Sequence, residues 1–320
     1  MATFTLAEAA KLSEDDLQRG VLETFVQSSP VLDRIPFLTV QGNAYAYNEE
    51  ATLPGVAFRN VNEAYAESTG TVNQKTESLV ILGGDADVDT FIVQTRGNLN
   101  DQRAIQTAMK VKAASYKFQD VFVNGDVAVD PKGFDGLKKR LTGAQVVDAG
   151  ASGLPIVGDG SDATIHKFFD KLEELMAAVQ GGPDALYANR SIIAKIKSAG
   201  RRAGGVEMVQ EDLTGKRVVT WNGVPILDIG TKADGTPIIP LDEPSGDATP
   251  TNDTTSIYAV KFGLGEGDQA TTGLTNGGVQ VKDLGEIDSQ PVYRTRLEFF
   301  CGMALFGGKA AARLNHVDNA

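Results

Sequence analysis

The amino-acid sequence predicts a mixed α+β fold in which one long helix packs against one long strand. The longest uninterrupted helical pattern covers residues 99–125, and Asn124-Gly125 supplies its end signal. Apolar and polar residues alternate over 292–306, which predicts a strand of about fifteen residues against the usual five or six. Residues 142–290 lie between these two elements and have the pattern of an inserted α/β region.

The long helix, which we call the spine helix, is roughly 37 Å long at 1.5 Å per residue. Asn98 or Asn100 is expected to cap its start. Its apolar arc is expected to meet the face of the strand at 293–305 and comprises Ala104, Ile105, Ala108, Met109, Val111, Ser115, Tyr116, Phe118, Phe122 and Val123. The opposite ridge is expected to face away from the strand and carries Gln102, Arg103, Gln106, Lys110, Lys117 and Asp120.

Composition indicates a globular protein without a dedicated nucleic-acid or membrane surface. The formal charge of −12 over 320 residues argues against a basic surface for DNA or anionic lipid. Cys301 is the only cysteine, which excludes an intrachain disulfide and fits a reducing compartment. No signal peptide is recognisable at the start, and no apolar run is long enough to cross a membrane. A cytoplasmic setting is therefore expected.

The first third of the sequence predicts an arm followed by a hairpin. Residues 1–36 form the expected arm, with a short amphipathic helix from Ser13 that must dock on another surface. Residues 37–96 contain strand-like segments at 38–47 and 75–82, separated by a long polar stretch. Because an isolated two-stranded ribbon is barely stable in water, we interpret this region as a long hairpin held by a neighbouring subunit. A mobile surface loop is the alternative.

Local signals place several elements after the spine helix. Asp162 is expected to cap one helix, and Asn189 a second helix that ends at Gly200. Asn222-Gly223 between two strand-like runs predicts a tight hairpin. The remaining predictions are a connector at 131–141, a flexible loop at 201–205, a polar loop at 242–253 and strands at 185–188, 256–262 and 279–284.

No arrangement of residues predicts catalytic, cofactor-binding or metal-binding chemistry. His166 and His316 have no Ser, Cys or carboxylate at a spacing that singles out a partner. Cys301 lies on the apolar face of the last strand, where a small buried side chain is expected. Residues 85–89 resemble the start of a calcium loop, but Thr90 stands where the sharp turn needs Gly. An acidic, solvated turn is the favoured interpretation.

Two further patterns are also expected to have no chemical role. The glycine-rich segment 263–278 and the run Gly307-Gly308-Lys309 lack the spacing of a phosphate-binding loop, which favours turns. The basic clusters Lys138-Lys139-Arg140 and Arg201-Arg202 are small, and we expect them to be solvated or at subunit contacts. The sequence therefore offers no residues for an enzyme hypothesis.

The order of elements resembles the major capsid proteins of tailed bacteriophages. The spine helix ends in VFVNGD, PKGFDGL follows, and the chain closes with YAVKFG, VKDLGE and PVYRTRLEFFCGMALFGGKAAARLNHV. Proteins of this family share the fold named for phage Hong Kong ninety-seven, which encapsulin nanocompartments also use. The resemblance covers nearly the whole chain and rests on the order of elements and on these phrases rather than on a short signature.

The resemblance implies a division of the chain and a role in a viral shell. The implied parts are an N-terminal arm (1–36), an E-loop hairpin with its base (37–96), a peripheral domain (97–141 and 291–320) and an axial domain (142–290). Such proteins form hexamers and pentamers that tile an icosahedral shell around double-stranded DNA. The implied location is the virion, with assembly in the host cytoplasm.

The resemblance also implies partners and contacts. The expected partners are further copies of the chain, a portal protein and packaged DNA bound without sequence specificity. Either a separate scaffolding protein is implied or the sequence is that of a mature form, and a decoration protein is an alternative to clamping between subunits. One branch of the family links subunits through an E-loop lysine, but residues 39–74 contain none, so non-covalent clamping is expected. The predicted inter-subunit residues of the E-loop are Glu49, Glu50, Arg59, Asn60 and Glu63, and those of a loop at the capsomer centre are Arg201 and Arg202.

Two other hypotheses remain open at this point. An encapsulin-like shell that encloses a cargo enzyme would form closed particles when this chain is expressed alone. A soluble α/β enzyme using His166, or Asp85 and Asp87, would be a discrete monomer or small oligomer with substrate-dependent activity.

Overall fold

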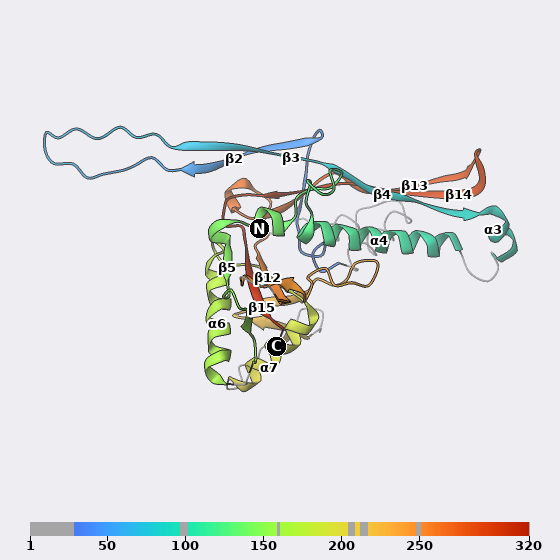
Figure 1. Ribbon diagram of the computed structural model, residues 1–320. Coiled ribbons are helices and arrows are strands. Elements are labelled where there is room, and N and C mark those ends of the chain that lie inside the picture. Colours follow the sequence, from blue (N-terminus) through green and yellow to red (C-terminus); the bar gives the residue numbers. More distant parts are fainter. Residues whose placement is uncertain are drawn as a thin grey trace.

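The computed structural model describes residues 29–96, 102–158, 161–203, 209–211, 217–247 and 251–319. Two sheets form the body, a long hairpin projects from it on one side, and helix α4 extends on the other (Figure 1). The predicted α+β class is confirmed. The predicted arm helix near Ser13 and the predicted cap at Asn98 or Asn100 lie outside the described residues. Among the described helices, none has the length and apolar character needed to cross a membrane.

The first sheet contains the long strand that the sequence predicts. Its strand order is β1-β13-β14-β4. Strand β14 (Gln290–Leu305, 16 residues) pairs antiparallel with β13 (Thr271–Ile287) on one side and with β4 (Val80–Asp89) on the other. The short strand β1 (Phe37–Thr39) runs parallel to β13. The strand predicted at 292–306 is therefore confirmed, and it lies inside the sheet rather than at its edge.

Helix α4 (Gln102–Asn124, 23 residues) is the spine helix, and it packs against the first sheet as predicted. The ring of Phe118 lies 6.1 Å from that of Phe37 and 6.0 Å from that of Phe299 on β14, measured between centroids. Phe122 and Leu297 belong to the same buried cluster. Each buried side chain of this size contributes roughly 1.5–3 kcal/mol, so this cluster joins helix and strand firmly.

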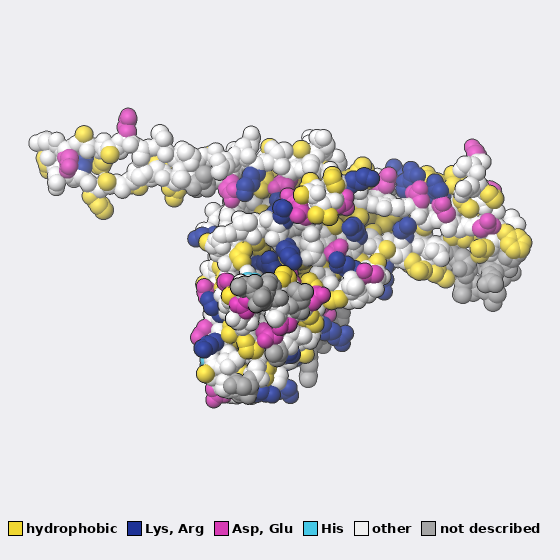
Figure 2. Space-filling view, in the orientation of Figure 1, with side chains coloured by type: hydrophobic (Ala, Val, Ile, Leu, Met, Phe, Trp, Pro, Cys, Tyr) yellow, Lys and Arg dark blue, Asp and Glu magenta, His cyan; other side chains and the backbone are white. Residues whose placement is uncertain are grey.

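The predicted apolar arc of α4 is wrong for the N-terminal half of the helix. Ile105 and Met109 were expected in the core, but they are 42 % and 60 % exposed. Phe91 and Ile92 of the short helix α3 (Thr90–Arg96) are also exposed at this end of the molecule. Figure 2 shows apolar side chains gathered at this end. The arc is buried only in the C-terminal half, from Val111 onward.

The predicted orientation of the polar ridge is wrong for two cations in the same half of α4, although Gln106 is exposed as predicted. Arg103 faces the sheet, where its Nη2 lies 2.5 Å from Oδ1 of Asp283 and its guanidinium covers the ring of Tyr293. The side chain of Lys110 lies against β4, and its charge helps to lower the pKa of Asp85. The first sheet presents acidic side chains toward the start of the helix, and these attract the cations inward. Only the C-terminal member of the basic ridge, Lys117, is exposed as expected.

The predicted hairpin is formed by β2 (Ala44–Thr52) and β3 (Thr71–Ser78), which pair antiparallel. Its base packs on the body through Tyr47, which is buried against the ring of Phe306 at 5.0 Å and donates a hydrogen bond to the carbonyl of Leu305. Tyr45 donates to Glu266 at 2.8 Å. Residues 53–70 form the tip, extend far from the body and have no regular secondary structure (Figure 1).

The second sheet is built mostly from the inserted region. Its main path is β5 (Val146–Asp148), β15 (Ala311–Asp318), β12 (Asn252–Val260), β7 (Ala185–Ala188), β10 (Val224–Asp228), β9 (Arg217–Trp221) and β8 (Val209–Glu211). Strands β6 (Leu154–Pro155) and β11 (Glu243–Pro244) pair with β15 and β12. Helices α6 (Asp162–Ala177) and α7 (Arg190–Arg202) carry its buried apolar cluster with residues such as Phe168 and Ile192. The structure also contains two short 3-10 helices, η1 (Gly143–Gln145) and η2 (Glu266–Asp268).

Sheet membership differs from the predicted division of the chain at two places. Strand β13 was expected in the inserted region, but it pairs with β14 in the first sheet. Strand β15 was expected with the closing strand, but it pairs with β12, β5 and β6 in the second sheet. The chain thus crosses between the sheets more often than a single insertion would require. After β14 in the first sheet, it returns to the second sheet, where β15 lies between β5 and β12.

Among the cap and turn signals of the second sheet, two are confirmed and two are wrong. Asn189 caps α7 through a hydrogen bond from the Ser191 N–H to its Oδ1, and Asn222-Gly223 joins β9 and β10 with both residues at positive φ. Helix α7 does not end at Gly200, which is buried inside it, but continues to Arg202. The cap of α6 is at position 161 rather than at Asp162. The strand predicted at 279–284 is confirmed as the middle of β13, which belongs to the first sheet.

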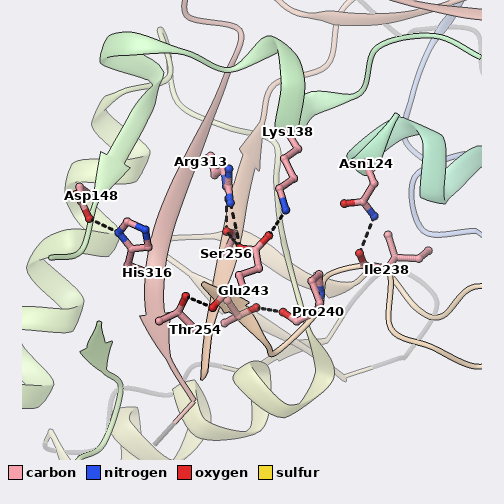
Figure 3. Close-up of polar contacts among 11 residues, drawn as sticks. Asn124, Lys138, Asp148, Ile238, Pro240, Glu243, Thr254, Ser256, Arg313 and His316 are labelled. Carbon is pink, nitrogen blue, oxygen red and sulfur yellow. Dashed lines mark hydrogen bonds and ion pairs between the residues drawn. The ribbon is translucent and has the colours of Figure 1, made fainter. Parts of the chain in front are cut away.

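A buried carboxylate links the second sheet to the short helix α5 (Leu137–Arg140). Glu243 was expected in a solvated polar loop, but it is 6 % exposed. It accepts hydrogen bonds from Lys138 at 2.6 Å, Arg313 at 3.0 Å and Ser256, as Figure 3 shows. Burial alone would raise the pKa of Glu243, but the charge of Arg313 and the contacts with Lys138 and Ser256 outweigh it and lower the pKa below 4.5.

The packing of α4 predicts the effect of a charge at Phe118. Phe118→Asp should abolish the folded subunit, because an unpaired buried charge costs about 3–5 kcal/mol and the three-ring contact is lost. Soluble yield and thermal unfolding followed by circular dichroism measure this. Lys117→Glu on the exposed face is the control and should fold normally. A Phe118→Asp variant with unchanged yield and melting temperature would show that the helix is assigned to the wrong face.

The Glu243 network predicts a loss of stability in acid. Because its folded pKa is depressed, Glu243 stabilises the fold above about pH 4.5, and this contribution disappears as the pH falls through the lower, folded pKa. Glu243→Gln should lower the free energy of unfolding by about 3 kcal/mol at neutral pH and flatten its fall below about pH 4.5. Urea unfolding at several pH values measures both. Glu174→Gln is the control. Glu174 pairs with Lys171 on the surface of α6, so its loss should have little effect on the free energy of unfolding. Parallel acid profiles for Glu243→Gln and the unmodified chain would refute the role of the network.

Candidate assembly interface

The tip of the β2–β3 hairpin exposes apolar side chains that have no core of their own. Val56 and Phe58 are fully exposed, at 99 % and 108 %. The other large apolar residues exposed on the tip or beside it are Leu53, Val61, Tyr65 and Val72. Figure 2 shows apolar side chains along the projecting hairpin, far from the two sheets of the body. Clusters of exposed apolar residues mark interaction surfaces in soluble proteins, so this tip is the foremost candidate interface.

Three of the five predicted contact residues of the hairpin lie together at its tip. Arg59 donates to the carbonyls of Asn60 and Glu63, both at 3.3 Å, and its guanidinium lies over the ring of Tyr65 at 5.1 Å. The Asn60 N–H donates to the Glu63 carboxylate at 3.0 Å. These contacts give the tip a defined turn, which helps to present the apolar residues beside it.

The other two predicted contact residues lie elsewhere on the hairpin. Glu49 is in β2 and forms an ion pair with Lys75 of β3 at 2.6 Å. Glu50 follows it in the same strand. The shaft of the hairpin is therefore held by its own pairing, and the five residues do not form one cluster. That they contact a neighbouring subunit remains a prediction.

Lys138 and Lys139 of helix α5 are exposed as expected, whereas Arg140 is mostly buried, and all three cations form ion pairs within the chain. Arg140 donates two hydrogen bonds to the Glu77 carboxylate on β3, one of them at 2.6 Å from Nη2 to Oε2. Burial would lower the pKa of Arg140, but the hydrogen bond and charge of Glu77 outweigh it and raise the pKa. Lys139 pairs with Asp126 just after α4 at 3.1 Å. We call this helix and its three pairs the α5 junction.

The acidic residues at 85–89 lie in strand β4 and not in a solvated turn, so the predicted turn is wrong. Asp85 accepts two hydrogen bonds from Arg296 on β14, at 2.8 and 3.0 Å. Asp87 does the same with Arg294, at 2.7 and 2.6 Å. These hydrogen bonds, made by cations directly opposite on β14, lower the pKa of both carboxyl groups. In the part of the chain that the structure describes, no three His, Cys or acidic residues group as a metal site.

The histidines and the cysteine have separate surroundings. His166 is exposed on α6, whereas His316 lies on β15 with its Nδ1 2.8 Å from Asp148. Cys301 is 1 % exposed within the cluster between α4 and β14, and burial raises its pKa to about 12. A thiol with so high a pKa is a poor nucleophile, which agrees with the expected structural role. Of these three side chains, His316 is the one that contacts a potential acid or base among the described residues, and that group is Asp148.

Arg201 and Arg202 occupy the last turn of α7 and are exposed. The prediction had placed them in a loop, and the structure extends the helix through both. They lie on the second sheet's side of the molecule, far from the hairpin tip (Figure 1). Their position at a capsomer centre remains a prediction.

The exposed residues at the free end of α4 form a second apolar surface that the sequence reasoning missed. Ile105 and Met109 are one helical turn apart, so they share a face. Sequence periodicity assigns these residues to the core, because it cannot show where the partner sheet becomes acidic. The acidic run at 85–89, placed beside this half of the helix, is the signal that could have reversed the assignment.

Comparisons with known proteins agree with this architecture. The sequence family described as major capsid protein GP7 matches residues 13–162, just under half of the chain. Among curated proteins, no sequence match was found. The holo-SrpI encapsulin of Synechococcus elongatus PCC 7942 superposes with a TM-score of 0.64 at 19 % identity, over 91 % of this chain and 88 % of the encapsulin.

Two viral or virus-like shells also share the fold. The capsid of a native GTA particle has a TM-score of 0.59 at 13 % identity and covers 91 % of this chain and 90 % of its own. The structure titled Mycobacterium phage Bobi has a TM-score of 0.59 at 15 % identity and covers 98 % of both chains. The shared fold agrees with the resemblance seen in the sequence: the chain has the Hong Kong ninety-seven-type fold, and its residues 13–162 are similar to the major capsid protein GP7 family.

Proposed function

We propose that this chain forms the hexamers and pentamers of an icosahedral phage shell around double-stranded DNA. The observation that carries the proposal is the projecting hairpin with its exposed apolar tip. Residues such as Val56 and Phe58 cannot reach either core of their own subunit. A surface of this kind is stable only when another molecule covers it.

A repeated contact between the hairpin and a different surface of the next copy would build a ring. Such heterologous contacts close into rings when the rotation between neighbours permits it. The hairpin then acts as the E-loop, and its tip, with Arg59, Asn60 and Glu63, is the clamp. The contact is non-covalent, because residues 39–74 contain no lysine for an isopeptide link.

The division of the chain follows the predicted parts with the observed sheet pairings added. Residues 1–36 are the arm and 37–96 the E-loop with its base. The spine helix, β13 and β14 form the peripheral domain. The axial domain comprises the inserted region together with β15, and Arg201 and Arg202 lie toward the capsomer centre.

The expected partners are a portal protein, a separate scaffolding protein and a decoration protein, with assembly in the host cytoplasm. Packaged DNA is held by the geometry of the shell and not by a specific binding site. The formal charge of −12 supports this view, since an acidic lining would not retain DNA tightly. The role is structural and not enzymatic.

An encapsulin-like compartment that encloses a cargo enzyme is the second candidate. It is favoured by the superposition on the SrpI encapsulin, whose TM-score of 0.64 exceeds those of the two shells above. Expression of this chain alone separates the candidates. Closed particles without any other gene product support the compartment, whereas a need for neighbouring gene products supports the phage shell.

The clamp is tested by the triple change Val56→Ser, Phe58→Ser and Val61→Ser. Because all three side chains are exposed, the subunit should fold with its free energy of unfolding changed by less than about 0.5 kcal/mol. Closed shells should be absent in electron micrographs of material prepared under conditions in which the unmodified chain assembles.

The matched control changes three exposed alanines of the same tip, Ala57, Ala64 and Ala66, to serine. This control should assemble normally, because it removes little apolar area. Normal shells from the Val56, Phe58 and Val61 variant would rule out apolar clamping by the hairpin tip.

A further inference from the structure

The α5 junction is fixed to the end of the spine helix by close backbone packing. The Gly136 N–H donates to the carbonyl of Gly125 at 2.9 Å. A Cβ atom on Gly136 would lie 2.5 Å from the carbonyl oxygen of Val121, so no larger residue fits without movement. Leu137 is completely buried in the cluster that contains the spine helix. Helix α5 and the end of α4 are therefore expected to move as one body.

The outer cations of α5 reach two different parts of the molecule. Arg140 holds Glu77 on strand β3, at the base of the hairpin. Lys138 holds Glu243, which precedes Pro244 in β11 of the second sheet. Between them, Lys139 pairs with Asp126, which directly follows the spine helix and so adds no further part.

Both acidic partners are held in place from their own side. Glu243 is bound by Arg313 of β15 and Ser256 of β12, so the Lys138 contact reaches into the middle of the second sheet. The Tyr47 hydroxyl of β2 lies 3.4 Å from the Glu77 carboxylate and shares its one hydrogen between Glu77 and the carbonyl of Leu305, so the Arg140 contact touches both strands of the hairpin. The side chains of Arg140 and Glu77 are only 15 % and 17 % exposed, so solvent screens this pair weakly.

We propose that the α5 junction couples the direction of the hairpin to the orientation of the second sheet, with Arg140 and Lys138 as positioning residues. Lys138 and Arg140 are two residues apart on one helical turn. A movement of the helix that shifts one of these side chains therefore also displaces the other. The consequence for assembly rests on the proposed function: a neighbour that grips the hairpin would thereby also bias the second sheet of the subunit it holds. The inferred partner of this coupling is a second copy of this chain.

Distances between spin labels test the coupling directly. Cys301 is the only cysteine and is buried, so cysteines introduced at exposed alanines can be labelled selectively. One pair, Ala64→Cys with Ala113→Cys, reports the hairpin against the spine helix. The other pair, Ala113→Cys with Ala194→Cys, reports the second sheet against the spine helix. The labelled full-length chain is diluted into an excess of unlabelled chain, so that distances between subunits do not contribute.

The variants are Glu77→Gln, which removes the charge and one acceptor oxygen from the hairpin contact, and Lys138→Met, which removes the second-sheet contact. Under the proposal each variant broadens the distance distribution of both label pairs. Amide exchange in β2 and β3 should also become about tenfold faster in both variants, as expected when a charge-assisted contact is lost. Lys139→Met is the matched control, because it removes a cation from the same helix without touching either part.

The outcomes separate coupling from simple anchoring. If Glu77→Gln alters only the hairpin pair and Lys138→Met only the second-sheet pair, the contacts are independent anchors and the proposal is wrong. Equal effects from Lys139→Met would also overturn it. A subunit that shows the coupling but forms no shell would count against the proposed function alone, so the two failures can be told apart.

Discussion

The contact between the spine helix and strand β14 is the interaction on which the rest of the structure depends. Phe118 lies against Phe37 and Phe299, and this one cluster joins the start of the described chain, its middle and its closing strand. Segments so far apart in sequence meet only when the first sheet is complete. The hairpin, the α5 junction and the second sheet are each attached to this core, and their relative positions follow from it.

The fold places stability and interaction in different parts of the molecule. The two largest buried clusters lie within the two sheets and their helices, whereas the hairpin tip and the free end of α4 expose apolar side chains. A monomer that kept these surfaces in water would lose the free energy that their burial provides. In the proposed shell, contacts between subunits supply that burial.

The elements could be predicted from the sequence where one physical signal dominates. Helix α4, strand β14, the Asn189 cap and the Asn222-Gly223 turn follow from periodicity and local hydrogen bonding. Features that depend on distant partners could not be predicted. The inward turn of Arg103 requires Asp283, and the burial of Glu243 requires Lys138 and Arg313, none of which is near in sequence. The sequence predicted an interface on the hairpin through five polar residues, and it did not single out the apolar residues that the structure exposes at the tip.

The account stands on the claim that the hairpin of one subunit binds the next. Electron cryomicroscopy of assembled particles, at a resolution that traces residues 53–70, tests it most directly. The account predicts that Val56 and Phe58 are buried against a neighbouring subunit. A map in which the tip folds back onto its own subunit, or remains in solvent within a closed shell, would contradict it.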